Sequence, residues 1–89
     1  MDLLQLVRKH EELERELDDN ALSIWAEISR SHPRLAVDTL DLFQSPQAAA
    51  RWTASRGHRE TSSPARLVAE GQVDAVLARL ERTAHGFVG

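Results

Sequence analysis

The first 56 residues contain no glycine, and their apolar residues recur at intervals of three and four. Such intervals place side chains on one face of an α-helix, whereas a half-buried strand would alternate apolar and polar residues, which no segment of this chain does. The clearest run lies near the N-terminus, and its members are Leu3, Leu6, His10, Leu13 and Leu17. We therefore predict an all-α fold, a small compact bundle of about five to six short helices.

Residues 1–42 are predicted to form an N-terminal helical segment made of a hairpin and a third helix. Asp2 can cap the first helix, and the polar run Asp18-Asp19-Asn20 interrupts its apolar pattern. Asp19 or Asn20 can then cap a second helix that extends to about Arg30. Because so short a link favours antiparallel neighbours, we expect the two helices to form a hairpin.

The apolar face of the first helix requires a partner. Two heptads are too short for a stable isolated coiled coil, so we expect residues 3–17 to pack on their own chain or on a second copy. A homodimer is therefore one possible assembly. His10, which shares this face, is expected to be a partly buried structural residue rather than a ligand.

Three further helices are predicted from their first residues. Pro33 follows the end of the hairpin and begins a helix whose buried face would be Leu35, Ala36, Leu40 and Phe43. Later, the pairs Ser45-Pro46 and Ser63-Pro64 each begin a helix, because the serine hydroxyl can accept a bond from a free backbone N–H and proline suits the first helical position. Residues 43–89 thus form a C-terminal helical domain, which we expect to pack with residues 1–42 as one compact unit.

The last part of the chain is marked by two glycines. Gly71 is expected to end the helix begun at Pro64, in the left-handed conformation typical of a C-terminal cap. Val73, Val76, Leu77 and Leu80 define the final helix by their helical spacing, and we predict that it ends at Gly86. The remaining residues 87–89 would form a short apolar tail, and an apolar tail needs a surface to cover it.

Composition narrows the functional classes. The chain has 89 residues, 42% of them hydrophobic, and no cysteine, so it can form one small core but no disulfide. No apolar run approaches the roughly 18 residues of a membrane span, and the N-terminus lacks the basic region of a signal peptide, so we expect a cytoplasmic protein without a membrane partner. The four histidines lie far apart and no nucleophile is paired with a base. We predict no metal, no cofactor and no enzymatic activity.

Several residues of the C-terminal half follow an ordered pattern. An alanine-rich stretch ends in Trp52, Ser63-Pro64 follows with apolar residues after it, and Gly71 precedes a helix that leads to His85-Gly86 and an aromatic residue. In this order and spacing they resemble the C-terminal toxin-binding domain of the Xre/MbcA/ParS group of bacterial antitoxins. The resemblance covers about half of the chain, from Phe43 onwards.

The resemblance implies that the chain is the antitoxin of a type II toxin–antitoxin pair, whose cognate partner is an NAD-consuming toxin of the RES type. In that family the extreme C-terminus reaches into the active site of the toxin. The matching residues here are His85, Gly86, Phe87, Val88 and Gly89. A short apolar segment in a nucleotide pocket blocks substrate without chemistry of its own.

A second candidate for partner binding is the basic loop with its flanking helix. Its residues are Arg56, His58, Arg59 and Arg66. By default such cations form a solvated surface, and the alternative is a patch that faces phosphate or an acidic partner. A DNA-binding transcriptional autorepressor is therefore a second hypothesis, although a net charge of −3 is unlike that of most nucleic-acid-binding domains. A helical dimerisation or adaptor module without a toxin partner is the third.

Overall fold

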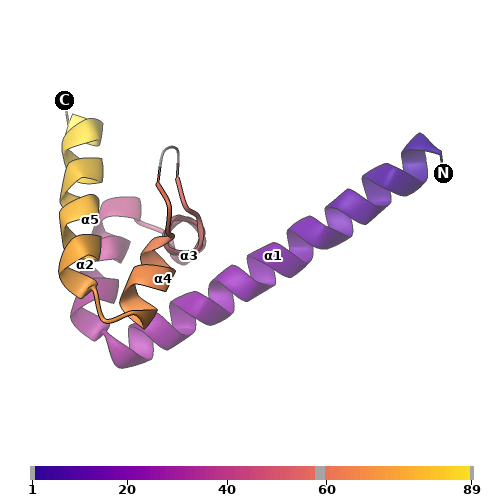
Figure 1. The fold of residues 1–89 in the computed structure, drawn as a ribbon. Helices are drawn as coiled ribbons and strands as arrows, with labels where there is room; N and C mark the ends of the chain where they lie inside the picture. The colour runs from indigo at the N-terminus through magenta and orange to yellow at the C-terminus, as the bar shows by residue number, and fades with distance from the viewer. Residues whose placement is uncertain (1, 58–59, 89) are drawn as a thin grey trace.

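The computed structural model describes residues 2–57 and 60–88. Its five helices are α1 (Leu3–Ser31), α2 (Pro33–Phe43), α3 (Pro46–Ala54), α4 (Pro64–Ala69) and α5 (Val73–Val88). Figure 1 shows α2 to α5 gathered at one end of α1, which extends far beyond them. The described residues contain no strand, so the all-α prediction is confirmed.

The long helix α1 replaces the predicted hairpin. It runs for 29 residues without a break, and Asp18, Asp19 and Asn20 are all helical. These three residue types are only several tenths of a kcal/mol per residue worse than alanine in a helix, and none of them removes a backbone hydrogen bond as proline would. Propensity is a weak signal that packing overrides. The hairpin prediction was therefore wrong.

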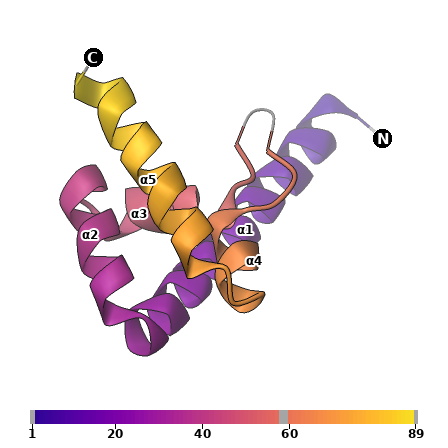
Figure 2. The same ribbon diagram turned by 60° about the vertical axis from the view of Figure 1, so that its left-hand side comes forward.

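The C-terminal half of α1 carries the core. Ile28 is 4% exposed and forms the centre of the core with Leu35 of α2 and Val76 of α5. Half-buried hydrophobic residues of α1, α3, α4 and α5 surround this centre, and they include Ile24 and Trp52. Figure 2 shows α5 beside α2 and α4, with which it packs.

The close approach of α1 and α3 depends on small side chains. Ala49 and Ala50 of α3 are 0% and 1% exposed, and Ala21 of α1 is also buried. Helix axes can approach closely where no large side chain separates them. The neighbouring Ala48 is only half-buried.

The predicted helix starts and the glycine cap are confirmed. The hydroxyl of Ser45 accepts a bond from the N–H of Ala48 at 3.0 Å, and that of Ser63 accepts one from Arg66 at 3.1 Å. Gly71 has a φ of +78°, and the N–H groups of Gly71 and Gln72 bond to carbonyls of the last turn of α4. This pair of bonds is the Schellman arrangement, which a glycine accommodates without strain.

Two details of the predicted helix faces differ. Leu35 and Ala36 are buried in α2 as expected, but Leu40 is 38% exposed. Phe43 is half-buried, and its ring centroid lies 5.5 Å from that of Trp52. The aromatic pair thus closes the junction between α2 and α3, which leaves Leu40 at the edge of the core.

The last helix continues through Gly86 to Val88, so the predicted stop at Gly86 was wrong. Glycine lowers the stability of a helix interior by about 1 kcal/mol, but it keeps its N–H and does not interrupt the hydrogen-bond ladder. Gly89 and the side chains of Phe87 and Val88 lie outside the described part of the chain. The backbone of residues 86–88 is therefore helical rather than a separate tail.

The projecting half of α1 gives the molecule an elongated shape. Its extents are 46 × 31 × 25 Å and its radius of gyration is 14.7 Å, whereas a compact domain of this length would have about 12 Å. The surface that the other helices leave uncovered is therefore concentrated on α1.

Candidate functional site

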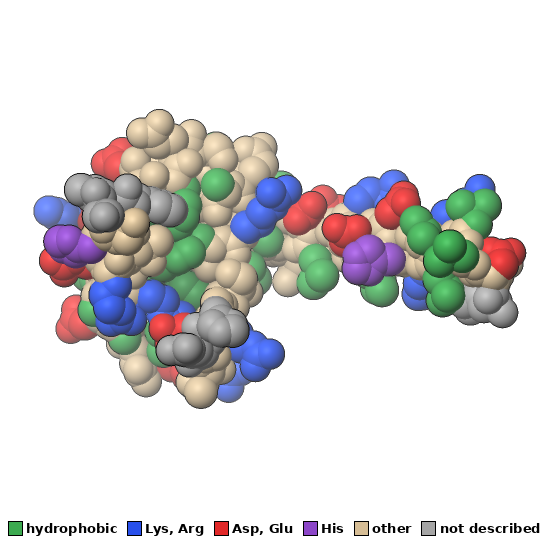
Figure 3. Space-filling model, turned by 90° about the horizontal axis from the view of Figure 1, so that it is seen from above, with side chains coloured by type: hydrophobic (Ala, Val, Ile, Leu, Met, Phe, Trp, Pro, Cys, Tyr) green, Lys and Arg blue, Asp and Glu red, His purple; other side chains and the backbone are tan. Residues whose placement is uncertain are grey.

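The N-terminal half of α1, residues 3–17, projects from the other helices and is called the arm here (Figure 1). Four leucines along one side of the arm form the leucine seam, and they are Leu3, Leu6, Leu13 and Leu17. Their exposed fractions are 76%, 52%, 45% and 68% respectively. Figure 3 shows hydrophobic side chains at the surface of the arm, interspersed with charged ones.

The leucine seam is the bare continuation of a stripe that the core covers further along α1. After Leu17 the same spacing of four, three and four residues leads to Ala21, Ile24 and Ile28. Ala21 and Ile28 are 5% and 4% exposed. One apolar face of a single helix is thus buried in its second half and open in its first.

His10 lies on the seam side of the arm. Its side chain is 73% exposed, and its Nε2 lies 3.3 Å from Oε1 of Glu14. The expectation of a partly buried histidine was therefore wrong for the single chain, because no other helix of the described chain covers this part of α1 (Figure 1).

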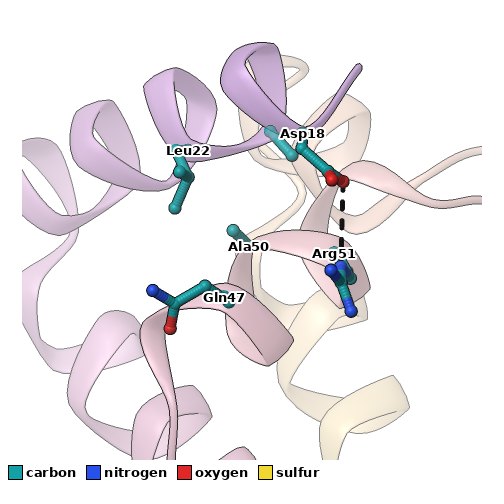
Figure 4. A pocket seen from close by; sticks show the side chains of 6 residues that line it. Asp18, Leu22, Gln47, Ala50 and Arg51 are labelled. Atoms are coloured by element: carbon teal, nitrogen blue, oxygen red, sulfur yellow. Dashed lines mark ion pairs between the residues drawn. The ribbon is translucent and has the colours of Figure 1, made fainter. Parts of the chain in front are cut away.

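We call helices α2 to α5, together with the second half of α1, the folded body. A hollow lies where the arm meets this folded body (Figure 4). Its volume is about 200 Å³, and we call it the α1–α3 hollow; its lining residues are Asp18, Ala21, Leu22, Gln47, Ala50 and Arg51. Nε of Arg51 lies 3.8 Å from Oδ1 of Asp18, and this ion pair crosses from α3 to α1. The hollow is therefore continuous with the exposed part of α1 and ends against α3.

The predicted toxin-binding residues lie on the last turns of α5. The side chain of His85 is 80% exposed, and its Nε2 lies 4.0 Å from Oε1 of Glu81. Gly86 is also exposed, and a Cβ placed there would have nothing within 4 Å. Both residues are therefore accessible to a partner, while the predicted contacts of Phe87, Val88 and Gly89 involve side chains or a residue outside the described part.

The predicted basic loop is only partly described. His58 and Arg59 lie outside the described residues. Arg56 is exposed, and it lines an open hollow together with Arg66, whose Nε lies 3.4 Å from Oε2 of Glu70. The structure thus brings Arg56 and Arg66 to one surface, and it places a carboxylate beside them.

Sequence reasoning missed the role of Glu60. Its carboxylate accepts a bond from Nη2 of Arg79 at 3.1 Å and lies 3.8 Å from Nη2 of Arg82. Arg79 also donates from Nη1 to the carbonyl of Ser62 at 2.7 Å. No local signal predicts a pairing of residues 19 positions apart. The loop is therefore attached to α5 through a carboxylate that offsets two arginines.

Glu27 and Arg30 form an ion pair at the end of α1, and this pair shifts the pKa values of both groups. The guanidinium of Arg30 donates to the carboxylate of Glu27 one turn earlier, with Nε at 3.1 Å from Oε2. This hydrogen bond lowers the pKa of Glu27 and raises the pKa of Arg30. Both groups are exposed. The shifts reflect a surface ion pair within one helix, and such pairs contribute little to stability.

Candidate metal-binding clusters and candidate membrane-spanning helices are both absent from the described residues. They contain no group of three or more histidines, cysteines or acidic residues placed to hold a metal ion. None of the helices in this part of the chain combines the length and hydropathy needed to cross a bilayer. What the structure does offer is exposed protein surface: the arm, the α1–α3 hollow and the end of α5.

No protein-family model matches the chain, and no curated protein and no solved structure matches it either.

Proposed function

We propose that the chain is an antitoxin that neutralises a RES-type, NAD-consuming toxin by direct binding, with the C-terminal end of α5 blocking the toxin active site. The observation that carries the proposal is the position of the motif residues on the folded chain. Trp52 lies in the last turns of α3, Ser63 and Pro64 begin α4, Gly71 separates α4 from α5, and His85 lies near the end of α5.

The motif residues fall into two groups. One group holds the helices in place, and the other lies at the exposed end of α5. Ser63, Pro64 and Gly71 fix the start and the end of α4, and Pro64 is buried. Trp52 packs on the core and on Phe43. His85 and Gly86, in contrast, are exposed and make no core contact that would explain their place in the pattern. An exposed end on a fixed helix suits insertion into the pocket of a partner.

Binding would inhibit the toxin by occupancy. A nucleotide pocket is a concave, largely apolar site with a few polar groups that orient the ligand. The end of α5 would offer it the imidazole of His85 together with the apolar residues that follow. Since the antitoxin occupies the space of NAD, it needs no catalytic group.

Co-expression with a RES-type toxin tests the proposal. The chain should restore growth and the cellular NAD level, and the two proteins should purify as one complex. Removal of residues 87–89 should abolish the restoration while the circular dichroism spectrum and the melting temperature stay close to those of the intact chain. Val37→Glu, on an exposed site of α2, is the matched control and should neutralise normally.

Two outcomes would contradict the proposal. If no complex forms with the toxin, the chain is not its antitoxin. If a complex forms and the variant without residues 87–89 still protects the cells, the C-terminal end does not carry the inhibition. Restoring NAD is the more specific readout, because growth alone can recover for unrelated reasons.

Promoter binding stays a prediction. Within the described part of the chain, Arg66 pairs with Glu70, and Arg79 and Arg82 pair with Glu60. These pairs reduce the positive charge available for phosphate near the loop. The structure therefore offers no specific observation that favours DNA as a partner over protein.

A further inference from the structure

We propose that the arm of α1 pairs with the arm of a second copy of this chain in antiparallel orientation, and that the leucine seams of the two copies form the centre of a homodimer. The pairing is independent of toxin neutralisation, since it uses the N-terminal arm and not the C-terminal end of α5. It rests on three features of α1: the open seam, the charge distribution along the arm and the hollow at its base.

The first feature is the open seam. A helix of two heptads is marginal in water by itself, and its leucines would normally be covered by another helix. All four leucines of the seam are at least 45% exposed in the single chain. The part of the same stripe after Leu17 is already covered by α3 and its neighbours. The leucine seam is therefore the part that remains for a partner.

The second feature selects the partner and its direction. Residues 2–10 carry two cations against one carboxylate, whereas residues 11–19 carry six carboxylates against one cation. Two arms placed antiparallel bring the cationic part of each against the acidic part of the other. Two arms placed parallel bring the two acidic parts together, and like charges side by side are unfavourable. The arm is therefore complementary to itself in one direction.

Individual side chains show the same complementarity. Lys9 and Glu16 are seven residues apart, so they flank the seam on the same side of α1. In an antiparallel pair the equivalent flanks face each other, so Lys9 of each copy lies opposite Glu16 of the other. The two-fold axis generates this ion pair twice, as expected for an isologous interface.

The third feature is the place where the partner helix ends. Alternating the seam positions of two antiparallel helices sets Leu6 of one copy opposite Leu17 of the other, and His10 opposite Leu13. In this register the N-terminal residues of each arm reach the neighbourhood of Asn20 on the other copy. The α1–α3 hollow begins there, between Asp18 and Leu22 (Figure 4), and Leu22 is 39% exposed. The hollow can therefore receive Leu3 of the partner.

The size of the interface predicts a reversible dimer. Two paired arms are in contact over a length of only about 25 Å. They therefore bury less surface area than a typical stable interface. We expect dissociation on dilution into the micromolar range or below rather than an obligate dimer. The antiparallel order also places the two folded bodies at opposite ends, where they do not obstruct each other.

Sedimentation equilibrium over a range of concentrations tests the pairing. The full chain should reach twice its mass of 10.0 kDa at high concentration. Leu13→Glu should raise the dissociation constant by about 100-fold or more, because a carboxylate would have to enter the apolar centre. Val37→Glu, the same type of change on an exposed site of α2, should leave it unchanged. Circular dichroism should show that both variants keep their helical folded body.

A chain that stays at 10.0 kDa at every concentration would overturn the proposal, and so would a dimer that Leu13→Glu does not weaken. A chain that stays monomeric and whose leucine seam binds only some other helical protein would also overturn it. A dimer that Val37→Glu weakens as much as Leu13→Glu would place the interface elsewhere.

Disulfide trapping tests the direction, and the chain has no cysteine of its own to interfere. Isotope-labelled Leu6→Cys and unlabelled Leu17→Cys should, after mixing and oxidation, give mainly the mixed labelled–unlabelled dimer. A parallel pair would instead cross-link each variant to itself. Predominance of the self-linked products would overturn the antiparallel arrangement.

Discussion

Arg79 on α5 donates a hydrogen bond from Nη2 to Oε2 of Glu60 at 3.1 Å, and this contact joins the loop before α4 to the last helix. The side chain of Arg79 is 14% exposed, whereas that of Glu60 is 36% exposed. Nε of Arg79 is buried and makes no hydrogen bond with the described residues. The guanidinium thus depends on Glu60 and on the carbonyl of Ser62 for its compensation.

Replacing Glu60 should destabilise the fold. Glu60→Ala leaves a largely buried arginine with one acceptor fewer, and we expect a loss of about 1 kcal/mol in the free energy of unfolding, a value reduced by the solvent exposure of the carboxylate. Arg82→Ala removes only the exposed 3.8 Å ion pair to the same carboxylate and should cost at most about 0.5 kcal/mol. Urea denaturation measures both values, and equal losses would contradict a special role for Arg79.

The continuous helix α1 predicts the sign of a substitution at Asn20. Inside a helix, Asn20→Ala should stabilise the fold by up to about 0.5 kcal/mol, because alanine has the higher helix propensity. If Asn20 capped the second helix of a hairpin, the same change would cost about 1 kcal/mol. Urea denaturation should be done in the Leu13→Glu background, so that association does not contribute.

Ser45→Ala provides the matched control for Asn20→Ala. Ser45 is an observed N-cap, since its hydroxyl accepts from Ala48 at 3.0 Å, so its replacement should destabilise the chain by about 1 kcal/mol. Opposite signs at the two positions are the expected result. Destabilisation by Asn20→Ala would support a break in α1.

The contact between α1 and α3 predicts intolerance of larger side chains. Ala49 is 0% exposed, so Ala49→Leu would have to force α3 away from its neighbours at a cost of about 1 to 3 kcal/mol. The same substitution at Ala26, which is exposed on α1, should change stability by less than about 0.5 kcal/mol. Thermal unfolding followed by circular dichroism distinguishes the two, and similar melting temperatures would mean that the α1–α3 contact is not tight.

The sequence predicts those parts of the fold that local chemistry decides. The helix starts at Pro46 and Pro64 and the cap at Gly71 depend on one or two residues each, and all three are confirmed. The hairpin failed because Asp18-Asp19-Asn20 only weakly disfavours a helix, and the burial of Ile28 and its neighbours outweighs that preference.

The candidate sites show the same limit. The spacing of the leucines predicts that the face of the arm is apolar, but only the structure shows that the folded body stops short of covering it. Likewise, Arg79 of α5 pairs with Glu60, which lies 19 residues earlier in a loop. Contacts between distant residues depend on how the helices are arranged, which periodicity does not determine.

The last prediction concerns Gly86, which separates stability from neutralisation. Because α5 remains helical through this position and a Cβ there would meet nothing within 4 Å, Gly86→Ala should stabilise the chain by about 0.5 to 1 kcal/mol. The added Cβ also disfavours any unwinding of the last turn.

If the end of α5 must leave the helix to enter the toxin, the more stable variant should neutralise less well. If it binds as a helix, Gly86→Ala should neutralise at least as well as the parent chain, unless the toxin contacts the glycine backbone directly. Gly86→Ser is the control for such contact, because it adds a Cβ of similar size but favours the helix less than alanine does. Melting temperature and NAD level, measured on the same variants, give the two readouts. A Gly86→Ala chain that is less stable than the parent would contradict the helical assignment of this turn.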